Sequence, residues 1–375
     1  MFPPQLMNIT KCLCKSMRVA RSSLADAGSF RPLVALGAGF LLPAQLVFGA
    51  SYFVAADGED GNSGEIGSPL RTIQAAMDLT QAGDTIEIRS GIYRELVRPR
   101  PANKGVAGNP ITIRAYDPDG AGPLLPEEVT ISGFEPVEPG ENGAGQWIDL
   151  GDGSGIWKLQ LTPNHGVRST RLNQVLYNGE VLRRERFPSA SRPLDFDYRT
   201  MARAEVGSRV LEVVTTIPAV YTATYKLSDL PPGDWTSARL FSCAGLGYNL
   251  DHGTVLSQDP DSITFSYPIV SLHNHASEAD PFFLYNSILA LDEPGEAFYD
   301  VEGVSGLSHT LYIIPPPGAT PDQSLVELRS LRNHPGSGTE SSNSAFWFTG
   351  GVEYVRVENL TVLGADVFAL ATASS

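Results

Sequence analysis

Residues 84–91 read Asp84-Thr85-Ile86-Glu87-Ile88-Arg89-Ser90-Gly91, an alternation of polar and apolar side chains that ends at a glycine. Such alternation over a short run is typical of a β-strand with one buried face. The pattern returns at Ile111 and Ile113, twenty-five residues on, and at Val129 and Ile131, eighteen residues later. A parallel β-helix produces such a repeat, because each coil buries its inward side chains only by stacking on its neighbours. The sequence therefore predicts solenoid coils, with an isolated meander as the alternative.

The residues before this strand predict a shorter strand, a turn and a helix. The apolar run at 51–54 leads into a cluster of Asp, Gly and Asn at 57–64. Ser68 is expected to cap the helix, and Pro69 suits its first turn. Its apolar face is expected to consist of Ile73, Ala76, Met77 and Leu79.

Composition favours a folded, turn-rich β protein over disorder or a helical bundle. Of the 375 residues, 42% are hydrophobic and 18% charged, and 37 are glycine and 28 proline. Basic residues precede an apolar run at 33–42, and small residues follow at Gly49 and Ala50, which is the pattern of a secretory signal. Residues 1–50 are therefore predicted to be a signal peptide and leader, with an uncleaved anchor as the alternative. The mature protein is expected to be secreted or periplasmic.

The net charge of −15 indicates a protein that repels nucleic acid and anionic membrane surfaces. Neither a nucleic-acid partner nor, after signal cleavage, a membrane partner is expected. Cys12 and Cys14 lie in the leader and leave Cys243 alone, so the mature chain forms no internal disulfide. No cofactor is expected.

The middle of the chain loses the regular spacing. Alternating strands at 210–214, 223–226 and 262–266 stand between connections rich in Pro and Gly, which favours an inserted β-sandwich-like region. Strand patterns at 345–348, 352–357 and 360–362 then restore the solenoid, with a turn at Glu358 and Asn359. The chain is predicted to divide into 51–146 (N-terminal cap and first coils), 147–327 (insertion) and 328–375 (resumed β-helix). Because the apolar end at 367–372 resembles no solenoid cap, a truncated chain is expected, with an end covered by a partner as the alternative.

Two sets of motifs resemble known carbohydrate-active proteins. The segments 52–62, 68–76, 82–86 and 90–95 look like the N-terminal cap of right-handed parallel β-helix proteins, many of which are secreted polysaccharide lyases or glycoside hydrolases. The segments 173–180, 186–188, 289–300 and 310–317 are similar to β-helix hydrolases interrupted by a β-sandwich. The resemblance covers most of residues 51–365. It implies an all-β fold, a right-handed parallel β-helix with a β-sandwich-like insertion.

The same resemblance places the catalytic acids on later coils, which this sequence lacks, and Ala297 stands where it favours tryptophan. Hydrolysis of a glycosidic bond needs two carboxyl groups that face one sugar. Asp195 and Asp197 share a strand face, and Asp366 follows the last recognisable strand. These three are the candidate catalytic residues, although solvated surface or turn positions are the favoured interpretation.

Arg183, Arg184 and Arg186 form the one notable basic cluster and are the candidate substrate-binding residues, toward a uronate or sulfate. Pairing with neighbouring carboxylates, or bracing of the insertion, is the favoured alternative. His273 and His275, and the loop that begins at Asp57, are weak metal candidates because neither has a full set of ligands at recognisable spacing. No metal site is therefore predicted.

Taken together, these patterns predict an exported polysaccharide-degrading protein, most similar to glycoside hydrolases, whose partner is a polysaccharide or oligosaccharide. This chain is expected to be an inactive N-terminal portion. The alternatives are a polysaccharide lyase and a non-catalytic glycan-binding or adhesin solenoid.

Overall fold

The computed structural model describes residues 7–9, 12–13, 49–120, 125–137, 139–140, 145–161, 174–190, 198–206, 210–216, 219–227, 229–244, 249–267, 281–329, 345–348, 351–364 and 370–372. The described chain is mostly β-strand, which confirms the all-β prediction. It divides into two compact units. The terminal unit comprises Leu6–Ser132 and Ser342–Ser375, and the central unit comprises Gly133–Ser341. None of the described helices is long and apolar enough to cross a membrane.

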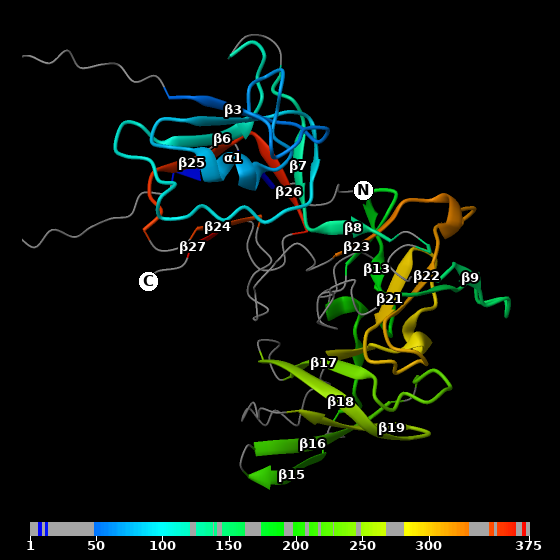
Figure 1. Cartoon of the computed structure of the whole chain (residues 1–375). Coiled ribbons are helices and arrows are strands. Elements are labelled where there is room, and N and C mark those ends of the chain that lie inside the picture. Colours follow the sequence, from blue (N-terminus) through cyan, green and yellow to red (C-terminus); the bar gives the residue numbers. More distant parts are fainter. Residues whose placement is uncertain are drawn as a thin grey trace, which may run out of the picture. The chain divides into compact units, whose positions relative to one another are not determined.

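Parallel strands build most of the terminal unit (Figure 1). One ladder runs in the order β25-β6-β4-β3 and a second in the order β26-β7-β5. A third parallel pair joins β24 to β27, and an isolated parallel bridge joins Val97 to Phe346 of β24. The strands are β3 (Ser51–Val54), β4 (Thr85–Ile88), β5 (Gly91–Tyr93), β6 (Ile111–Ala115), β7 (Val129–Ser132), β24 (Phe346–Phe348), β25 (Val355–Glu358), β26 (Leu360–Leu363) and β27 (Leu370–Thr372).

Strand register in the terminal unit differs from the sequence repeat. Ile86 lies opposite Ile113, and Ile111 lies opposite Val355, so β4 and β6 pair two residues out of the predicted phase. β7 belongs to the second ladder and does not continue the first. The inward side chains still form one core, because Ile86, Ile113 and Ile131 are all buried in the same cluster.

Two short strands from the predicted leader also pair within this unit. β1 (Met7–Ile9) is antiparallel to β26, and β2 (Cys12–Leu13) is antiparallel to β25. The leader was predicted to be removed on export, and its removal stays a prediction.

Helix α1 (Ile73–Leu79) begins later than the sequence suggested. Leu70 forms a parallel bridge with Val54 and keeps the chain extended past Ser68, so Ser68 cannot be the cap. Thr72 is the N-cap, and its side chain accepts a hydrogen bond from the Ala75 amide at 3.1 Å. Ile73, Ala76 and Met77 are buried as predicted, whereas Leu79, the last residue of the helix, is 47% exposed.

The described residues of the central unit form three sheets, which are predominantly antiparallel. Its largest sheet has seven strands in the order β14-β20-β17-β18-β19-β16-β15. These strands are β14 (Ala202–Arg203), β15 (Val210–Thr216), β16 (Ala219–Lys226), β17 (Arg239–Ala244), β18 (Asn249–Asp259), β19 (Ser262–Tyr267) and β20 (Pro281–Tyr285). The strands predicted at 210–214, 223–226 and 262–266 are confirmed here.

Two further sheets of the central unit share one core. One runs β13-β21-β22-β10-β9 and the other β12-β11-β23-β8. Side chains from both form a single cluster that includes Leu159, Tyr299 and Leu328. The strands are β8 (Phe134–Pro136), β9 (Ile148–Asp149), β10 (Trp157–Gln160), β11 (Val175–Tyr177), β12 (Glu180–Val181), β13 (Arg183–Arg184), β21 (Glu296–Asp300), β22 (Thr310–Ile314) and β23 (Val326–Arg329). The short helices are η3 (Tyr198–Thr200), η4 (Ile288–Ala290) and η5 (Pro321–Gln323).

Both faces of β20, within the seven-stranded sheet, are buried. In β20, Phe282 and Leu284 belong to one apolar cluster, while Phe283 and Tyr285 belong to another. This alternation follows the period of two of a strand. Across the described chain antiparallel pairs outnumber parallel ones, and every parallel pair except β13–β21 belongs to the terminal unit.

Candidate functional site

A pocket of about 290 Å³ opens at the end of the seven-stranded sheet in the central unit. It is lined by Phe187, Pro188, Met201, Ala202, Arg203, Leu227, Asp229, Leu230 and Phe282. Strand pairing brings these segments together. In register, Ala202 of β14 lies opposite Phe282 of β20, and Phe187 and Leu284 exchange backbone hydrogen bonds of 2.8 and 2.9 Å. We call this site the sheet-end pocket.

Apolar side chains lie behind the sheet-end pocket, and several of them expose little surface to it, since Leu227 is 5% and Met201 7% exposed. Phe282 is fully buried and belongs to the same cluster as Trp235. Phe187 is half-buried, and its ring lies 5.7 Å from the Trp235 ring, tilted by 50°. Because Phe187 packs on a fixed indole, its position in the pocket wall is set by the core behind it.

Two exposed charged residues, Arg203 and Asp229, stand in the lining of the sheet-end pocket. A guanidinium only donates hydrogen bonds and a carboxylate only accepts them. The pocket therefore carries two charged groups among its exposed lining residues, beside apolar side chains that are largely buried.

Arg186 lies buried behind the sheet-end pocket and connects two of the segments that line it. Its side chain is 0% exposed. Nε donates to the Pro188 carbonyl at 2.7 Å, and Nη2 donates to the carbonyl and to the hydroxyl of Thr200, each at 2.7 Å. The guanidinium also lies over the Phe283 ring, 4.8 Å from its centre. Arg186 thus connects the segment that carries Phe187 to the helix η3 that precedes β14.

The other two predicted arginines also have partners within the chain. Arg183 donates to Glu293 at 2.8 Å, to the Ala190 carbonyl at 2.7 Å and to the Pro294 carbonyl at 3.0 Å. Arg184 lies over the Tyr285 ring at 4.5 Å. Of the three candidate substrate contacts, Arg186 is therefore enclosed by protein, and Arg183 and Arg184 are half-buried in ion-pair and stacking contacts. Whether they touch substrate stays a prediction.

Glu296 is the most perturbed carboxyl group beside these arginines. It is 0% exposed, and burial raises its pKa to about 7. Oε2 accepts from the amides of Asp292 and Glu293 at 3.2 Å, and both bonds oppose the effect of burial. Among the described residues nothing donates to Oε1, and Arg183 Nη1 lies 3.6 Å away.

The predicted catalytic residues cannot be placed. Asp195, Asp197 and Asp366 lie outside the described residues, as do His273 and His275.

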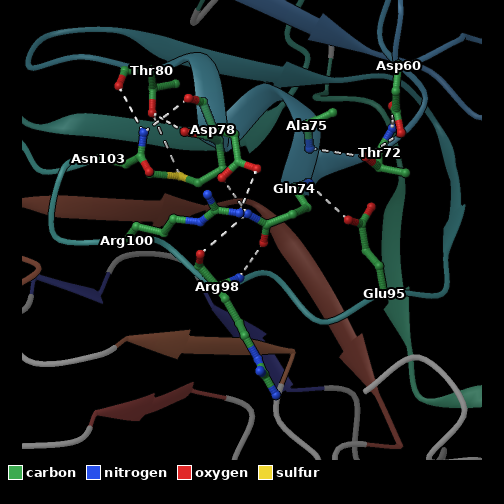
Figure 2. A network of polar contacts seen from close by, with 11 residues as sticks. Asp60, Thr72, Gln74, Ala75, Asp78, Thr80, Glu95, Arg98, Arg100 and Asn103 are labelled. Carbon is green, nitrogen blue, oxygen red and sulfur yellow. Dashed lines mark hydrogen bonds and ion pairs between the residues drawn. The ribbon is translucent and has the colours of Figure 1, made fainter. Parts of the chain in front are cut away.

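The loop that begins at Asp57 is part of a helix cap. Asp60 accepts from the amides of Arg71 and Thr72 and from the Thr72 hydroxyl, at 2.8–3.0 Å. Figure 2 shows this carboxylate beside Thr72 and shows Glu95 reaching the first turn of the helix. In the part of the chain that the structure describes, no three His, Cys, Asp or Glu side chains gather to hold a metal ion.

Sequence reasoning missed the sheet-end pocket. Its segments lie up to about ninety-five residues apart, between Phe187 and Phe282, and only strand pairing joins them. The one signal available was the segment 186–188, which the resemblance to interrupted β-helix hydrolases had singled out.

Comparison with known proteins gives local sequence matches and structural matches that cover most of the chain. No protein-family model matches the chain. It is 39% identical over 77 residues to pectate lyase PEL9 of Emericella nidulans, which is 20% of this chain and 18% of that protein. It is 36% identical over 81 residues to the uncharacterised protein YwoF of Bacillus subtilis, 22% of this chain and 15% of that protein. The chain thus spans less than a fifth of either relative in its matched part.

A solved structure described as a glycoside hydrolase resembles this fold with a TM-score of 0.50. The likeness covers 83% of this chain and 51% of that structure, at 17% sequence identity. At this identity the likeness concerns the fold. A similar arrangement of strands therefore makes up about half of that larger structure.

Proposed function

We propose that the protein is an exported, glycoside hydrolase-like protein that degrades polysaccharide. The observation that carries a carbohydrate-active role is the sequence match to pectate lyase PEL9. The preference for a hydrolase comes from the resemblance of the segments 173–180, 186–188, 289–300 and 310–317, and the fold likeness to a glycoside hydrolase structure supports it.

The proposal includes a right-handed parallel β-helix for the terminal unit. Three sets of parallel strands support it, because β4, β5 and Val97 follow one another along the chain and each pairs with a later parallel strand. One strand per face and per repeat is the arrangement of a solenoid. The central unit then corresponds to the β-sandwich-like insertion.

Polysaccharide lyase is the second candidate, favoured by the name of the same fungal relative. A lyase leaves an unsaturated sugar that absorbs ultraviolet light, whereas a hydrolase leaves only a new reducing end. The two products therefore separate the candidates in a single digest.

The 375-residue chain is proposed to bind glycans without cleaving them. It spans about half of the glycoside hydrolase structure that it resembles, and cleavage needs two carboxyl groups positioned on one sugar. The protein is further proposed to be secreted or periplasmic, on the signal pattern at 33–50, and to have no nucleic-acid or membrane partner.

The test is a panel of neutral and acidic plant and algal polysaccharides, incubated with this chain and with the longest product of the same gene. Reducing ends and ultraviolet absorbance are measured. Reducing ends from the longest product alone, without absorbance, are expected. Turnover by the 375-residue chain that Asp195→Ala, Asp197→Ala or Asp366→Ala abolishes would refute its inactivity, and absence of any product from either protein would refute the enzyme.

A further inference from the structure

We propose that a second copy of this chain pairs with the outer edge of β25 once the leader is removed. The outer edge is the side of β25 that faces away from β6 in the terminal unit. The two copies would form a two-fold dimer, in which β25 of one copy runs antiparallel to β25 of the other. This inference concerns association and is independent of the proposed enzymatic function.

The outer edge of β25 presents backbone groups that need hydrogen-bond partners. On the inner side, Ile111 of β6 donates to the Tyr354 carbonyl at 3.0 Å. Backbone groups alternate in direction along a strand, so Val355 and Val357 direct their amides and carbonyls to the outer edge. Both valine side chains are buried in the core of the terminal unit, which fixes the edge in place.

In the part of the chain that the structure describes, only the leader occupies this edge. β2 lies antiparallel on it, with Cys12 opposite Val357. The other end of the same ladder differs, because the chain that follows β3 covers it. Phe53 of β3 donates to the Gly64 carbonyl at 2.7 Å and accepts from the Leu70 amide at 2.9 Å. Removal of the leader therefore uncovers β25 and leaves β3 covered.

β25 lacks the features with which proteins usually protect an open edge. Those features include proline, lysine and a β-bulge. β25 reads Val355-Arg356-Val357-Glu358, and it pairs with β6 without a shift in register. An uncovered edge of this kind is a template for pairing with another chain.

The side chains of β25 complement a second copy of the same strand. A two-fold axis at Val357 would place Arg356 of each copy opposite Glu358 of the other. Both side chains lie on the outer face of the sheet, where they are 41% and 14% exposed and 3.5 Å apart within one chain. Opposite charges directly across a ladder stabilise it, and the symmetry provides this pair twice. The axis also makes the strands antiparallel, which is the direction in which β2 already binds.

The test compares the 375-residue chain before and after its leader is cut off at a protease site inserted before Gly49. Sedimentation velocity in reducing buffer measures the oligomeric state. The uncut chain should stay monomeric, and the cut chain, separated from its leader, should dimerise with a Kd on the order of 10 µM. A synthetic peptide of residues 6–14 should return the dimer to monomer. The same peptide with Cys12→Pro should not, because proline has no amide to donate.

Charge variants of the cut chain test the register of the dimer. Glu358→Lys should weaken dimerisation by about fivefold or more, because it places two pairs of positive charges across the axis. Adding Arg356→Glu should restore most of the affinity. Glu59→Lys, the same change of charge at an exposed residue in the loop between β3 and α1, is the matched control and should leave the Kd nearly unchanged.

Three results would overturn the proposal. They are a cut chain that stays monomeric at about 200 µM, higher oligomers in place of dimers, and a peptide or charge variants that behave like their controls. The peptide competition uses the unaltered sequence of the folded part, so it does not depend on how well the variants fold. None of these outcomes depends on the polysaccharide digest.

Discussion

Arg186 is a buried side chain that holds two segments of the central unit together. Sequence reasoning grouped it with Arg183 and Arg184 as a basic cluster, whereas the structure encloses it completely. Its planar guanidinium satisfies acceptors on two segments at the same time, and a lysine ammonium cannot reproduce that geometry.

Arg186→Lys is therefore expected to lower the free energy of unfolding by on the order of 3 kcal/mol. Denaturant unfolding of the variant and of the unaltered protein checks this loss. Arg184→Lys, in the same segment but half-buried over Tyr285, is the control and should cost less than 1 kcal/mol. Equal losses for the two variants would contradict the positioning role.

Glu296 is expected to make stability depend on pH. Its folded pKa of about 7 lies above the ordinary value of 4.5, so the folded state keeps a proton that the unfolded state releases. The contribution of Glu296 to the free energy of unfolding is then greatest below pH 4.5. It falls by about 3 kcal/mol as the pH rises toward 7. Glu296→Gln keeps an acceptor for the two amides and should remove this slope.

The measurement is the free energy of unfolding of both proteins between pH 4.5 and 8. The advantage of Glu296→Gln should grow with pH. Glu293→Gln, which alters an exposed carboxylate bound to the same Arg183, should leave the slope unchanged. Parallel curves for Glu296→Gln and the unaltered protein would show that Glu296 ionises normally.

At the scale of an element, α1 depends on carboxylates from outside the helix. Glu95 accepts from the amides of Ile73 and Gln74 at 2.8 and 3.0 Å, and these are among the first amides that a helix leaves unpaired (Figure 2). Burial still raises the pKa of Glu95, despite the two hydrogen bonds that lower it. The helix has only seven residues, so it relies on these contacts and on its buried face.

Glu95→Ala is expected to destabilise the first turn of α1 by about 1–2 kcal/mol. Amide hydrogen exchange at Ile73 and Gln74 should accelerate accordingly. Glu95→Gln retains the acceptor and should preserve most of the protection. Asp78→Ala, on the exposed side of the same helix, is the control. Unchanged exchange in Glu95→Ala would mean that the amides find other partners.

At the scale of the whole molecule, the predicted cleavage site at Ala50 lies at the start of the folded terminal unit. Its amide donates to Asp84 Oδ1 at 2.7 Å, directly before β3 begins at Ser51. Cleavage after Gly49 would place a new ammonium group on that carboxylate, so the mature terminus would be held in the fold. Intact-mass analysis of secreted protein is expected to show a chain that begins at Ala50 or Ser51. Secreted material that retains residues before Arg31 would contradict this prediction.

Several strands were predictable from the sequence, because alternation of side chains is a local property. The strand at 85–88, three of the seven strands of the large antiparallel sheet and the three buried residues of α1 were predicted from pattern. The start of α1 was not, since the bridge between Leu70 and Val54 depends on a partner strand. A motif can suggest a cap, but competing long-range hydrogen bonds decide where the helix begins.

Tertiary structure alone decided register and site. Ile86 faces Ile113 and not Ile111, because stacking fits whole side-chain surfaces and a two-residue shift leaves the same side chains inward. The sheet-end pocket joins Phe187, Arg203 and Phe282 through strand pairing, and no local pattern records such a meeting. Burial of Arg186 follows from the same packing. The local pattern of the sequence indicates which side chains are buried, but long-range strand pairing decides which of them are in contact.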